Sequence, residues 1–157
     1  MEQIETCVSF LFGKAYQHIM AATKERLAPY GVTPVQFALL HVLWGQDGQS
    51  SAALGARLQL DSATMTGVLD RLAHAGALER RPDAADRRIN RIFLTAQGRA
   101  LQAPLNAVMD GLNADLFGQF AAADAERLRA MVAQLGRVAA PPAATGPDAP
   151  APTPDTD

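Results

Sequence analysis

The stretch of residues 50–75 constrains the fold most strongly, because it predicts two helices joined by a turn of three residues. The first helix ends at Leu58 and contains side chains small enough to let another helix approach closely: Ala52, Ala53, Gly55 and Ala56. The second runs over 62–75, with apolar residues at spacings of three and four: Met65, Val68, Leu69 and Leu72. Gly76 follows as a stop, and the candidate N-caps are Ser50 or Ser51 and Asp61 or Ser62. This pattern predicts a helix-turn-helix.

An arginine-rich hairpin is predicted directly after the second helix. Residues 78–81 and 89–95 are typical of two short strands, and the five residues from Pro82 to Asp86 form the connection. The net charge of the chain is −2, but six arginines and only two acids fall within 80–99, a local balance of +4: Arg80, Arg81, Arg87, Arg88, Arg91 and Arg99 against Asp83 and Asp86. A basic stripe of this kind is an electrostatic footprint for phosphate, and the alternative is a solvated charged hairpin.

Two helices are predicted before this region. Apolar residues at helical spacing over 2–28 form a stripe wider than one core face needs, and Pro29-Tyr30-Gly31 ends that helix. Thr33 followed by Pro34 begins a second helix, which is apolar almost all round over 35–44 and therefore expected to be buried.

Two further helices are predicted after the hairpin. Thr95 can cap a helix that runs to about Phe120, with a kink because the ring of Pro104 clashes with the carbonyl of Ala100. Asp124 opens a last helix that ends near residue 138. The predicted fold is mostly α, in the order α-α-α-α-β-β-α-α.

Composition limits the remaining possibilities. The 157 residues, 48% of them apolar and 19% charged, are typical of one folded domain, here 1–139, and residues 140–157 are rich in proline and alanine, which predicts a disordered tail. No apolar run approaches a membrane span and no secretory leader is visible, so we expect a cytoplasmic protein without a membrane partner. Cys7 is the single cysteine, and His18, His41 and His74 lack ligand spacing, so we expect no metal or other cofactor.

Residues 60–98, LDSATMTGVLDRLAHAGALERRPDAADRRINRIFLTAQG, resemble the MarR family of bacterial transcription regulators. The matching features are Leu-Asp-Arg-Leu followed by glycine, then Glu-Arg, the Asp-x-Arg of Asp86 and Arg88, and Leu94-Thr95 before Gly98. The resemblance extends over the body from about 2 to 138. It implies a winged helix-turn-helix, with a DNA-binding lobe at about 50–95 and a homodimer built from helices at about 2–28 and 96–139. It also implies repression that a small molecule, often an aromatic acid, relieves.

The resemblance also assigns DNA-binding roles to particular residues. Arg88 matches the wing-tip arginine that enters the minor groove, and Asp86 matches the carboxylate that supports it. The other expected DNA-binding residues lie on the reading helix and around the tip: Ser62, Thr64, Thr66, Arg81, Arg87 and Arg91. Arg80 is expected either to join them or to stay within the protein or meet a ligand carboxylate.

The resemblance also implies an effector pocket between the dimer helices and the lobe. On the second helix Phe37, His41 and Trp44 lie on one face, where they offer stacking surface and a donor to an aromatic acid. The first helix adds Tyr16, Gln17, His18 and Arg26 as candidates. The alternative is that His41 and Trp44 are core residues with satisfied ring nitrogens.

The predicted function is a ligand-responsive repressor that binds a pseudo-palindromic operator in double-stranded DNA as a homodimer and that a small aromatic acid releases. One alternative is a peroxide sensor of the same family that uses Cys7, although we expect low thiolate character there because no base is nearby. Another is a dimeric winged-helix module that binds proteins and not DNA. An enzyme is not expected, because no activated nucleophile, carboxylate pair or glycine-rich phosphate loop is present.

Overall fold

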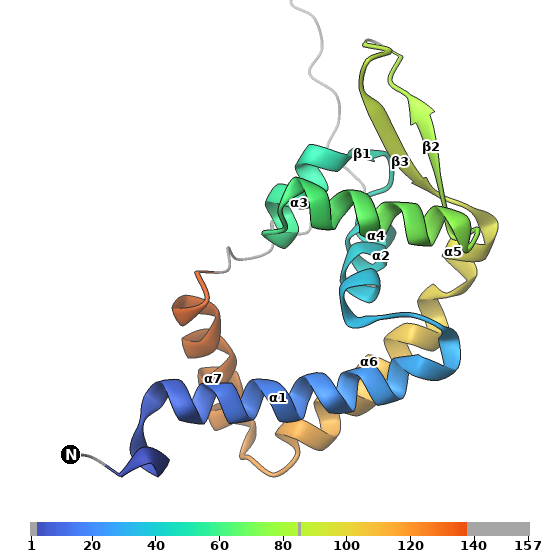
Figure 1. Ribbon diagram of the computed structural model, residues 1–157. Coiled ribbons are helices and arrows are strands. Elements are labelled where there is room, and N and C mark those ends of the chain that lie inside the picture. The colour runs from blue at the N-terminus through green and yellow to red at the C-terminus, as the bar shows by residue number, and fades with distance from the viewer. Residues whose placement is uncertain (1–2, 85, 138–157) are drawn as a thin grey trace, which may run out of the picture. The chain divides into compact units, whose positions relative to one another are not determined.

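The computed structural model describes residues 3–84 and 86–137 and divides into two compact units, one ending at Leu116 and one beginning at Phe117 (Figure 1). The predicted tail at 140–157 and the predicted end of the last helix lie outside the described residues. The elements follow in the order η1 Ile4–Thr6, α1 Val8–Leu27, η2 Ala28–Tyr30, α2 Pro34–Gly45, β1 Gln49–Ser50, α3 Ser51–Leu58, α4 Ser62–His74, β2 Leu78–Pro82, β3 Asn90–Leu94, α5 Ala96–Ala100, α6 Gln102–Phe117 and α7 Ala122–Leu135.

The helix-turn-helix is confirmed as α3 and α4. Ser50 caps α3 by accepting a hydrogen bond from the backbone N–H of Ala53, and Asp61 caps α4 by accepting one from the N–H of Thr64. Between them Gln59 adopts a left-handed conformation, with φ of 53°, which lets the chain reverse within the short turn. The caps and the turn together fix where the exposed face of α4 begins.

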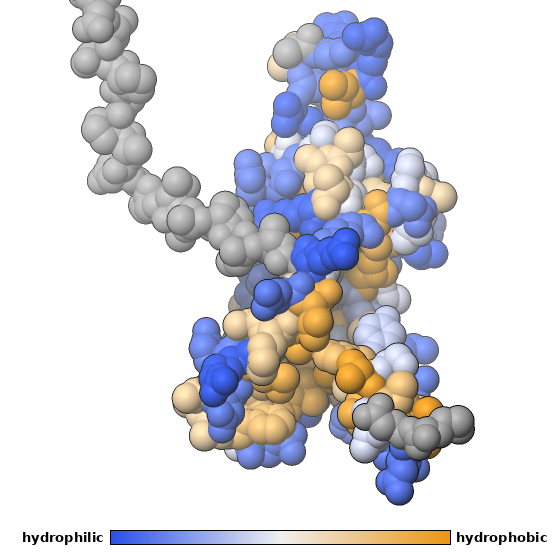
Figure 2. Space-filling model, turned by 90° about the vertical axis from the view of Figure 1, so that its left-hand side faces the viewer, coloured by the Kyte–Doolittle hydropathy of each residue, from blue (hydrophilic) through white to orange (hydrophobic). Residues whose placement is uncertain are grey.

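The predicted hairpin forms as β2 and β3, which project from the body beside α4 (Figure 1). A short third strand, β1, was not predicted from the sequence; it pairs with β3, so the antiparallel sheet has the order β1-β3-β2. Figure 2 shows that hydrophilic side chains cover almost all of the projecting hairpin. The hairpin enters the core through Leu78 of β2 and through Ile92 and Leu94 of β3, which are at most 4% exposed.

The prediction of one helix over 2–28 is wrong at its beginning. Ile4–Thr6 form a 3₁₀ turn, Cys7 is extended with ψ of 118°, and α1 begins at Val8. The hydroxyl of Thr6 donates to the carbonyl of Gln3 at 2.8 Å, and such local bonds compete with a regular helix. The predicted end is confirmed, because α1 stops at Leu27 and Gly31 takes a φ of 65°.

The prediction of a kinked helix after Thr95 is confirmed, and at the kink the structure divides the helix into two, α5 and α6. Thr95 caps α5, the helix breaks at Leu101, and α6 begins one residue later with Pro104 in its first turn. α6 ends at Phe117 rather than near Phe120. In the second unit α7 begins at Ala122 with Asp124 in its first turn, and the guanidinium of Arg129 lies 4.0 Å from the centre of the Phe117 ring.

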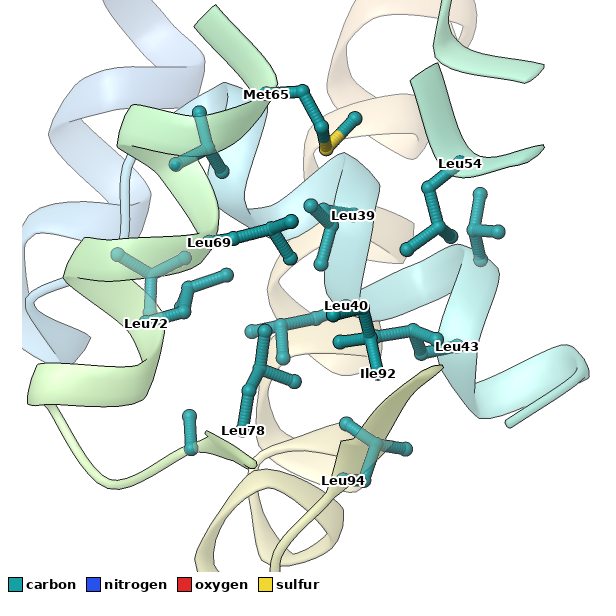
Figure 3. Close-up of a cluster of buried hydrophobic side chains, with 14 of the residues drawn as sticks. Leu39, Leu40, Leu43, Leu54, Met65, Leu69, Leu72, Leu78, Ile92 and Leu94 are labelled. Atoms are coloured by element: carbon teal, nitrogen blue, oxygen red, sulfur yellow. The ribbon is translucent and has the colours of Figure 1, made fainter. Parts of the chain in front are cut away.

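The core of the first unit lies between α2, α3, α4 and the base of the hairpin (Figure 3). α2 enters it with Leu39, Leu40 and Leu43, which are at most 1% exposed. The other labelled members are Leu54 of α3, Met65, Leu69 and Leu72 of α4, and Leu78, Ile92 and Leu94 of the strands. The prediction that the whole of α2 is buried is wrong at His41, which is exposed. Among the described helices, none has both the length and the apolar character of a membrane span.

Candidate nucleic-acid interface

The exposed face of α4 carries the short side chains that the sequence predicts there, and two of its hydroxyl protons are already used. Thr64 donates its hydroxyl proton to Asp61 at 2.6 Å, and Thr66 donates its own to the carbonyl of Ser62 at 2.8 Å. The hydroxyl and then the backbone N–H of Thr64 hold the pKa of Asp61 below its usual value. With these protons committed, both threonines present acceptor lone pairs and a methyl group outward. That surface suits the donors and methyl groups of base edges better than it suits phosphate oxygens.

The hairpin tip holds one arginine in a fixed and exposed position. Arg88 donates from Nε to Asp86 Oδ1 at 3.0 Å and from Nη2 to Asp86 Oδ2 at 2.8 Å, and its backbone N–H also donates to Oδ1 at 3.0 Å. The Arg88 side chain nevertheless remains 90% exposed. The Arg88 guanidinium and then its N–H lower the pKa of Asp86, and the carboxylate in turn raises the pKa of Arg88. This geometry is the two-point contact that the Asp-x-Arg spacing predicts.

Two other arginines of the hairpin, Arg81 and Arg91, have internal partners. Arg81 stands opposite Arg91 in the strand register, and because side chains alternate along a strand, both lie on the face opposite to Arg80. Arg81 pairs with Glu79 and lies 4.7 Å over the Phe93 ring. Arg91 pairs with Asp83 and donates to the carbonyl of Gly48 at 3.0 Å.

Arg80 and Arg87 complete the basic set. Arg80 donates to Asp70 of α4 at 2.7 Å, so one of its expected alternatives, a contact within the protein, is present. Arg87 is exposed beside the tip. The roles of Asp70 and Asp83 were not predicted from the sequence. The cross-strand register would have indicated Asp83, whereas Asp70 meets Arg80 through the packing of α4 beside β2.

A groove of about 560 Å³ lies between the beginning of α3, the exposed face of α4 and the hairpin. Ser51 and Thr66 line it from the helices, and Arg80 and Arg88 line it from the hairpin. The structure therefore brings the reading helix and the arginine tip to one concave surface. Such a surface admits a polyanion from outside, with hydroxyls on one wall and guanidinium groups on the other.

The aromatic face of α2 is also present as predicted. The ring centres of Phe37 and His41 are 5.6 Å apart, and the Trp44 ring lies 6.0 Å from the first and 6.1 Å from the second. His41 is exposed, whereas Trp44 is half-buried and its ring N–H donates to the carbonyl of Gly98 at 3.0 Å. The satisfied nitrogen of Trp44 agrees with the core alternative for that residue.

The candidates on α1 have surroundings of their own. Tyr16 is 65% exposed, His18 is also exposed, and the side-chain oxygen of Gln17 accepts from Lys14 at 3.4 Å. Arg26 forms an ion pair with Asp115 of α6. The polar contacts of Gln17 and Arg26 are therefore made with α1 itself and with α6, rather than with the aromatic face of α2. Within the described part of the chain, no group of three or more side chains suited to a metal ion comes together.

Cys7 differs from the expectation of low thiolate character. It is the N-cap residue of α1, and its sulfur lies 3.2 Å from the hydroxyl oxygen of Ser9. The Ser9 hydroxyl, followed by the backbone N–H groups of Phe10 and Ser9, lowers the pKa of the thiol. Hydrogen-bond donors at the beginning of α1 therefore favour the thiolate of Cys7, although no base is nearby.

A reading helix beside a hairpin with an exposed basic tip defines the class of winged helix-turn-helix proteins. The model of the MarR family matches residues 32–89. Over 97 residues the chain is 38% identical to the HTH-type transcriptional regulator TtmR of Methylorubrum extorquens, covering 62% of this chain and 46% of that protein, so the chain spans about half of TtmR. It is 32% identical to the HTH-type transcriptional repressor Rv2887 of Mycobacterium tuberculosis over 70% of this chain and 79% of that one.

A solved structure gives the same result for the fold. The structure of BpsR from Bordetella bronchiseptica superposes with a TM-score of 0.81 at 26% identity, covering 87% of this chain and 97% of that chain. TtmR is a transcriptional regulator and Rv2887 is a transcriptional repressor. The chain belongs to the MarR family, as its sequence indicated.

Proposed function

We propose that this protein is a repressor that binds a pseudo-palindromic site in double-stranded DNA as a homodimer. α4 of each copy enters a major groove, and the Arg88 tip enters the neighbouring minor groove. Ser62, Thr64 and Thr66 contact the bases or the adjoining backbone, while Arg87 contacts phosphate. The helices within 2–28 and 96–139 form the dimer and hold the two lobes about 34 Å apart, one turn of the double helix.

The observation that supports this proposal most is the tip itself. A carboxylate grips the Arg88 guanidinium at two points and leaves it 90% exposed on a projecting hairpin beside α4. A surface arginine that only stabilised the fold would be expected to lie against the body. Arg81 and Arg91 have internal partners, and we propose that they contact phosphate only at the rim.

The test begins with selection of duplexes from a random library, followed by binding measured by fluorescence anisotropy at several salt concentrations. Arg88→Ala is expected to weaken binding to the selected duplex about tenfold or more. Arg127→Ala removes the same charge from an exposed position on α7 and is expected to leave affinity within about twofold. Each phosphate neutralised contributes about −0.9 to the slope of log affinity against log salt.

Two results would contradict the proposal. One is the failure of any duplex to bind at low salt, which would favour a winged-helix module for protein partners. The other is equal affinity of the Arg88→Ala and Arg127→Ala variants, which would remove the tip from the interface.

We further propose that a small aromatic acid releases the protein from DNA by binding at the exposed side of the Phe37–His41–Trp44 face. The rings give stacking surface, His41 gives a donor, and Tyr16, Gln17, His18 and Arg26 are candidates for the opposite wall. In BpsR, DNA binding is regulated by 6-hydroxynicotinic acid, a molecule of this chemistry. A thermal-shift screen with benzoate, hydroxycinnamate and 6-hydroxynicotinate tests the idea, because a ligand specific to the folded state raises Tm. His41→Ala is expected to abolish the shift.

A second candidate function, peroxide sensing at Cys7, is favoured by one observation, the lowered pKa of the thiol at the beginning of α1. If it is correct, stoichiometric organic peroxide releases the protein from the selected duplex and Cys7→Ser prevents the release. A wild-type protein that stays bound after peroxide treatment would exclude this candidate.

A further inference from the structure

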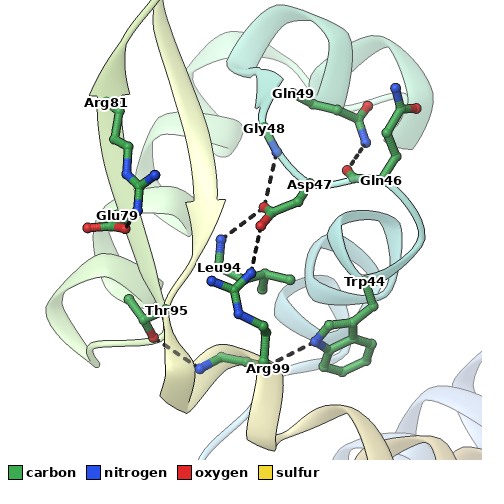
Figure 4. A network of polar contacts seen from close by, with 11 residues as sticks. Trp44, Gln46, Asp47, Gly48, Gln49, Glu79, Arg81, Leu94, Thr95 and Arg99 are labelled. Carbon is green, nitrogen blue, oxygen red and sulfur yellow. Dashed lines mark hydrogen bonds and ion pairs between the residues drawn. The ribbon is translucent and has the colours of Figure 1, made fainter.

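Asp47 lies in the turn between α2 and β1, and its carboxylate joins three segments of the chain (Figure 4). Oδ1 accepts hydrogen bonds from the N–H of Gly48 at 3.0 Å and from the N–H of Leu94 at 2.9 Å. Oδ2 accepts from Nη1 of Arg99 at 2.9 Å. One side chain thus connects the end of α2, the last residue of β3 and α5, and it is not among the residues proposed to contact DNA or the effector.

The bond to Leu94 replaces one that a longer strand would make. β1 has only two residues, and they pair with Ile92 and Arg91 of β3. The N–H of Gly48 donates to Ile92 at 3.0 Å, but Leu94 lies beyond the end of β1. The N–H group of a buried residue such as Leu94 needs an acceptor, and the Asp47 carboxylate continues the ladder by one more bond.

A second side chain, from β3 itself, also holds this turn against the hairpin. Arg91 of β3 donates to the carbonyl of Gly48 at 3.0 Å. Gly48 has a φ of 72°, and a Cβ there would lie 2.8 Å from the Phe93 ring, so the turn and the strand are in close contact. Directional hydrogen bonds therefore fix the base of the hairpin. Asp47 accepts one of them from Leu94, and Arg91 donates another to Gly48.

The base of β3 controls the position of the tip because a paired strand transmits a change of direction. From Leu94 to Asn90, β3 spans about 13 Å, and Arg88 lies two residues beyond it in the turn. A tilt of about 5° at the base therefore moves the far end of the strand by about 1 Å. Binding groups need to be placed within about 0.5 Å, so a displacement of this size takes the guanidinium out of register with a groove.

We propose that Asp47 is the positioning residue of the hairpin: its carboxylate sets the direction in which the hairpin leaves the body and, through that direction, the fit of Arg88 to DNA. This inference rests on the proposed DNA-binding function of the hairpin. It predicts that loss of the carboxylate weakens DNA binding although Asp47 itself touches no DNA. With two backbone or side-chain hydrogen bonds to β3 and α5 lost, the expected effect is about tenfold.

A double-mutant cycle with Arg88 tests the inference, with affinity for the selected duplex measured by fluorescence anisotropy. Asp47→Ala is expected to weaken binding about tenfold in the wild-type chain and less than about twofold in the Arg88→Ala chain, since a misplaced tip matters only when its arginine is present. Asp47→Asn retains an oxygen for Gly48 and Leu94 and is expected to restore most of the affinity. Asp110→Ala removes the same charge from an exposed position on α6, and it serves as the control once sedimentation shows that it has the same oligomeric state as the wild type.

A measurement without DNA separates this inference from the proposed function. In the Cys7→Ser background, spin labels at Ala84 near the tip and at Arg57 of α3 report the direction of the hairpin, with labelled chains diluted into unlabelled ones. Asp47→Ala is expected to shift or broaden the distance distribution, and Asp47→Asn is expected to restore it. Circular dichroism and Tm check that every variant is folded.

The outcomes are distinct. An unchanged distance distribution in the Asp47→Ala variant overturns the positioning role, whatever happens to DNA binding. Equal losses of affinity in both backgrounds also overturn it, because they indicate a general effect on the fold. If instead Arg88→Ala leaves DNA binding intact, the proposed role of the tip fails, while the spin-label distances still decide whether Asp47 directs the hairpin.

Discussion

The Asp86–Arg88 pair shows how a single carboxylate prepares an exposed arginine for binding. Because the guanidinium is already held at two points, the DNA contact proposed for Arg88 would not require a long flexible side chain to be ordered at the moment of binding. The pKa of Asp86 lies below its usual value of about 3.9, so the pairing is complete above that pH and is lost only as the pH falls through the lowered pKa. Titration of this pair therefore contributes nothing to a change in DNA binding between about pH 5 and 8.

Cys7 provides a residue-scale prediction because its lowered pKa has a specific first cause. The rate of alkylation by iodoacetamide follows the thiolate, so its midpoint pH in the wild type is expected to lie below the usual thiol pKa of about 8.5. Ser9→Ala removes the hydroxyl that contributes most and is expected to move the midpoint upward. Thr6→Ala is the control, since its hydroxyl bonds to the carbonyl of Gln3. Identical midpoints in all three proteins would mean that Ser9 does not stabilise the thiolate.

At the residue scale, sequence spacing predicts contacts within a turn better than contacts between strands. Asp86 and Arg88 are two residues apart in the hairpin connection, so their pairing follows from chain geometry alone. Arg91 and Asp83 are joined across the hairpin, and Arg81 lies over Phe93, so both contacts depend on the register of β2 with β3. If the strand register slips by one residue, an arginine side chain moves to the opposite face of the sheet. Nothing in the composition specifies the register of β2 with β3.

Among the elements, α5 meets the turn between α4 and β2 so closely that opposite effects are expected for two glycines. A Cβ at Gly98 would lie 2.1 Å from the carbonyl oxygen of Ala77, whereas at Gly67 of α4 its nearest neighbour would be a flexible arginine end at 3.8 Å. Gly98→Ala is therefore expected to lower the free energy of unfolding by about 1–3 kcal/mol through overpacking. Gly67→Ala is expected to raise it by about 0.5–1 kcal/mol, because alanine favours a helix interior.

Urea unfolding monitored by circular dichroism measures both changes. A Gly98→Ala variant as stable as the wild type would show that α5 can move away from Ala77 at little cost. Gly98→Ala also affects the contact through which Trp44 meets α5, since the indole N–H donates to the carbonyl of Gly98. A displaced α5 is therefore expected to change the fluorescence of Trp44 as well.

The predictability of each element depends on how local its causes are. The capped helices α2, α3 and α4 were predicted because their signals lie within a few residues: Thr33 with Pro34, Ser50 and Asp61. The break before α6 follows from Pro104 for the same reason. β1 was missed because two residues show no periodicity, and its pairing with β3 is a contact across more than forty residues.

At the scale of the whole molecule, exposed apolar side chains on α1 indicate that one chain leaves surface for a partner. Val8 is 65% exposed, Leu11 50% and Phe12 44%, with Ile19 and Tyr16 further along the helix also exposed. A contiguous apolar face on one helix is typical of an interface between copies. The proposed function needs such an interface, because two lobes at a fixed separation recognise successive major grooves where one lobe cannot.

A charge placed in this face is therefore expected to separate the copies. Leu11→Glu is expected to sediment as a monomer and to bind the two-half-site duplex about 100-fold more weakly than the wild type, because the avidity of linked lobes is lost, while its affinity for a single half-site is nearly unchanged. Ala21→Glu adds the same charge at an exposed position two residues from Ile19, about 200° around the helix, and is expected to remain dimeric. If Leu11→Glu remains a dimer and keeps its full affinity for the two-half-site duplex, the copies associate through another surface. The ratio of affinity for the two-half-site duplex to affinity for the single half-site is the second criterion. If this ratio is the same in Leu11→Glu and in the control variant, the lobes act independently on DNA, and a fixed separation between them has no role in recognition.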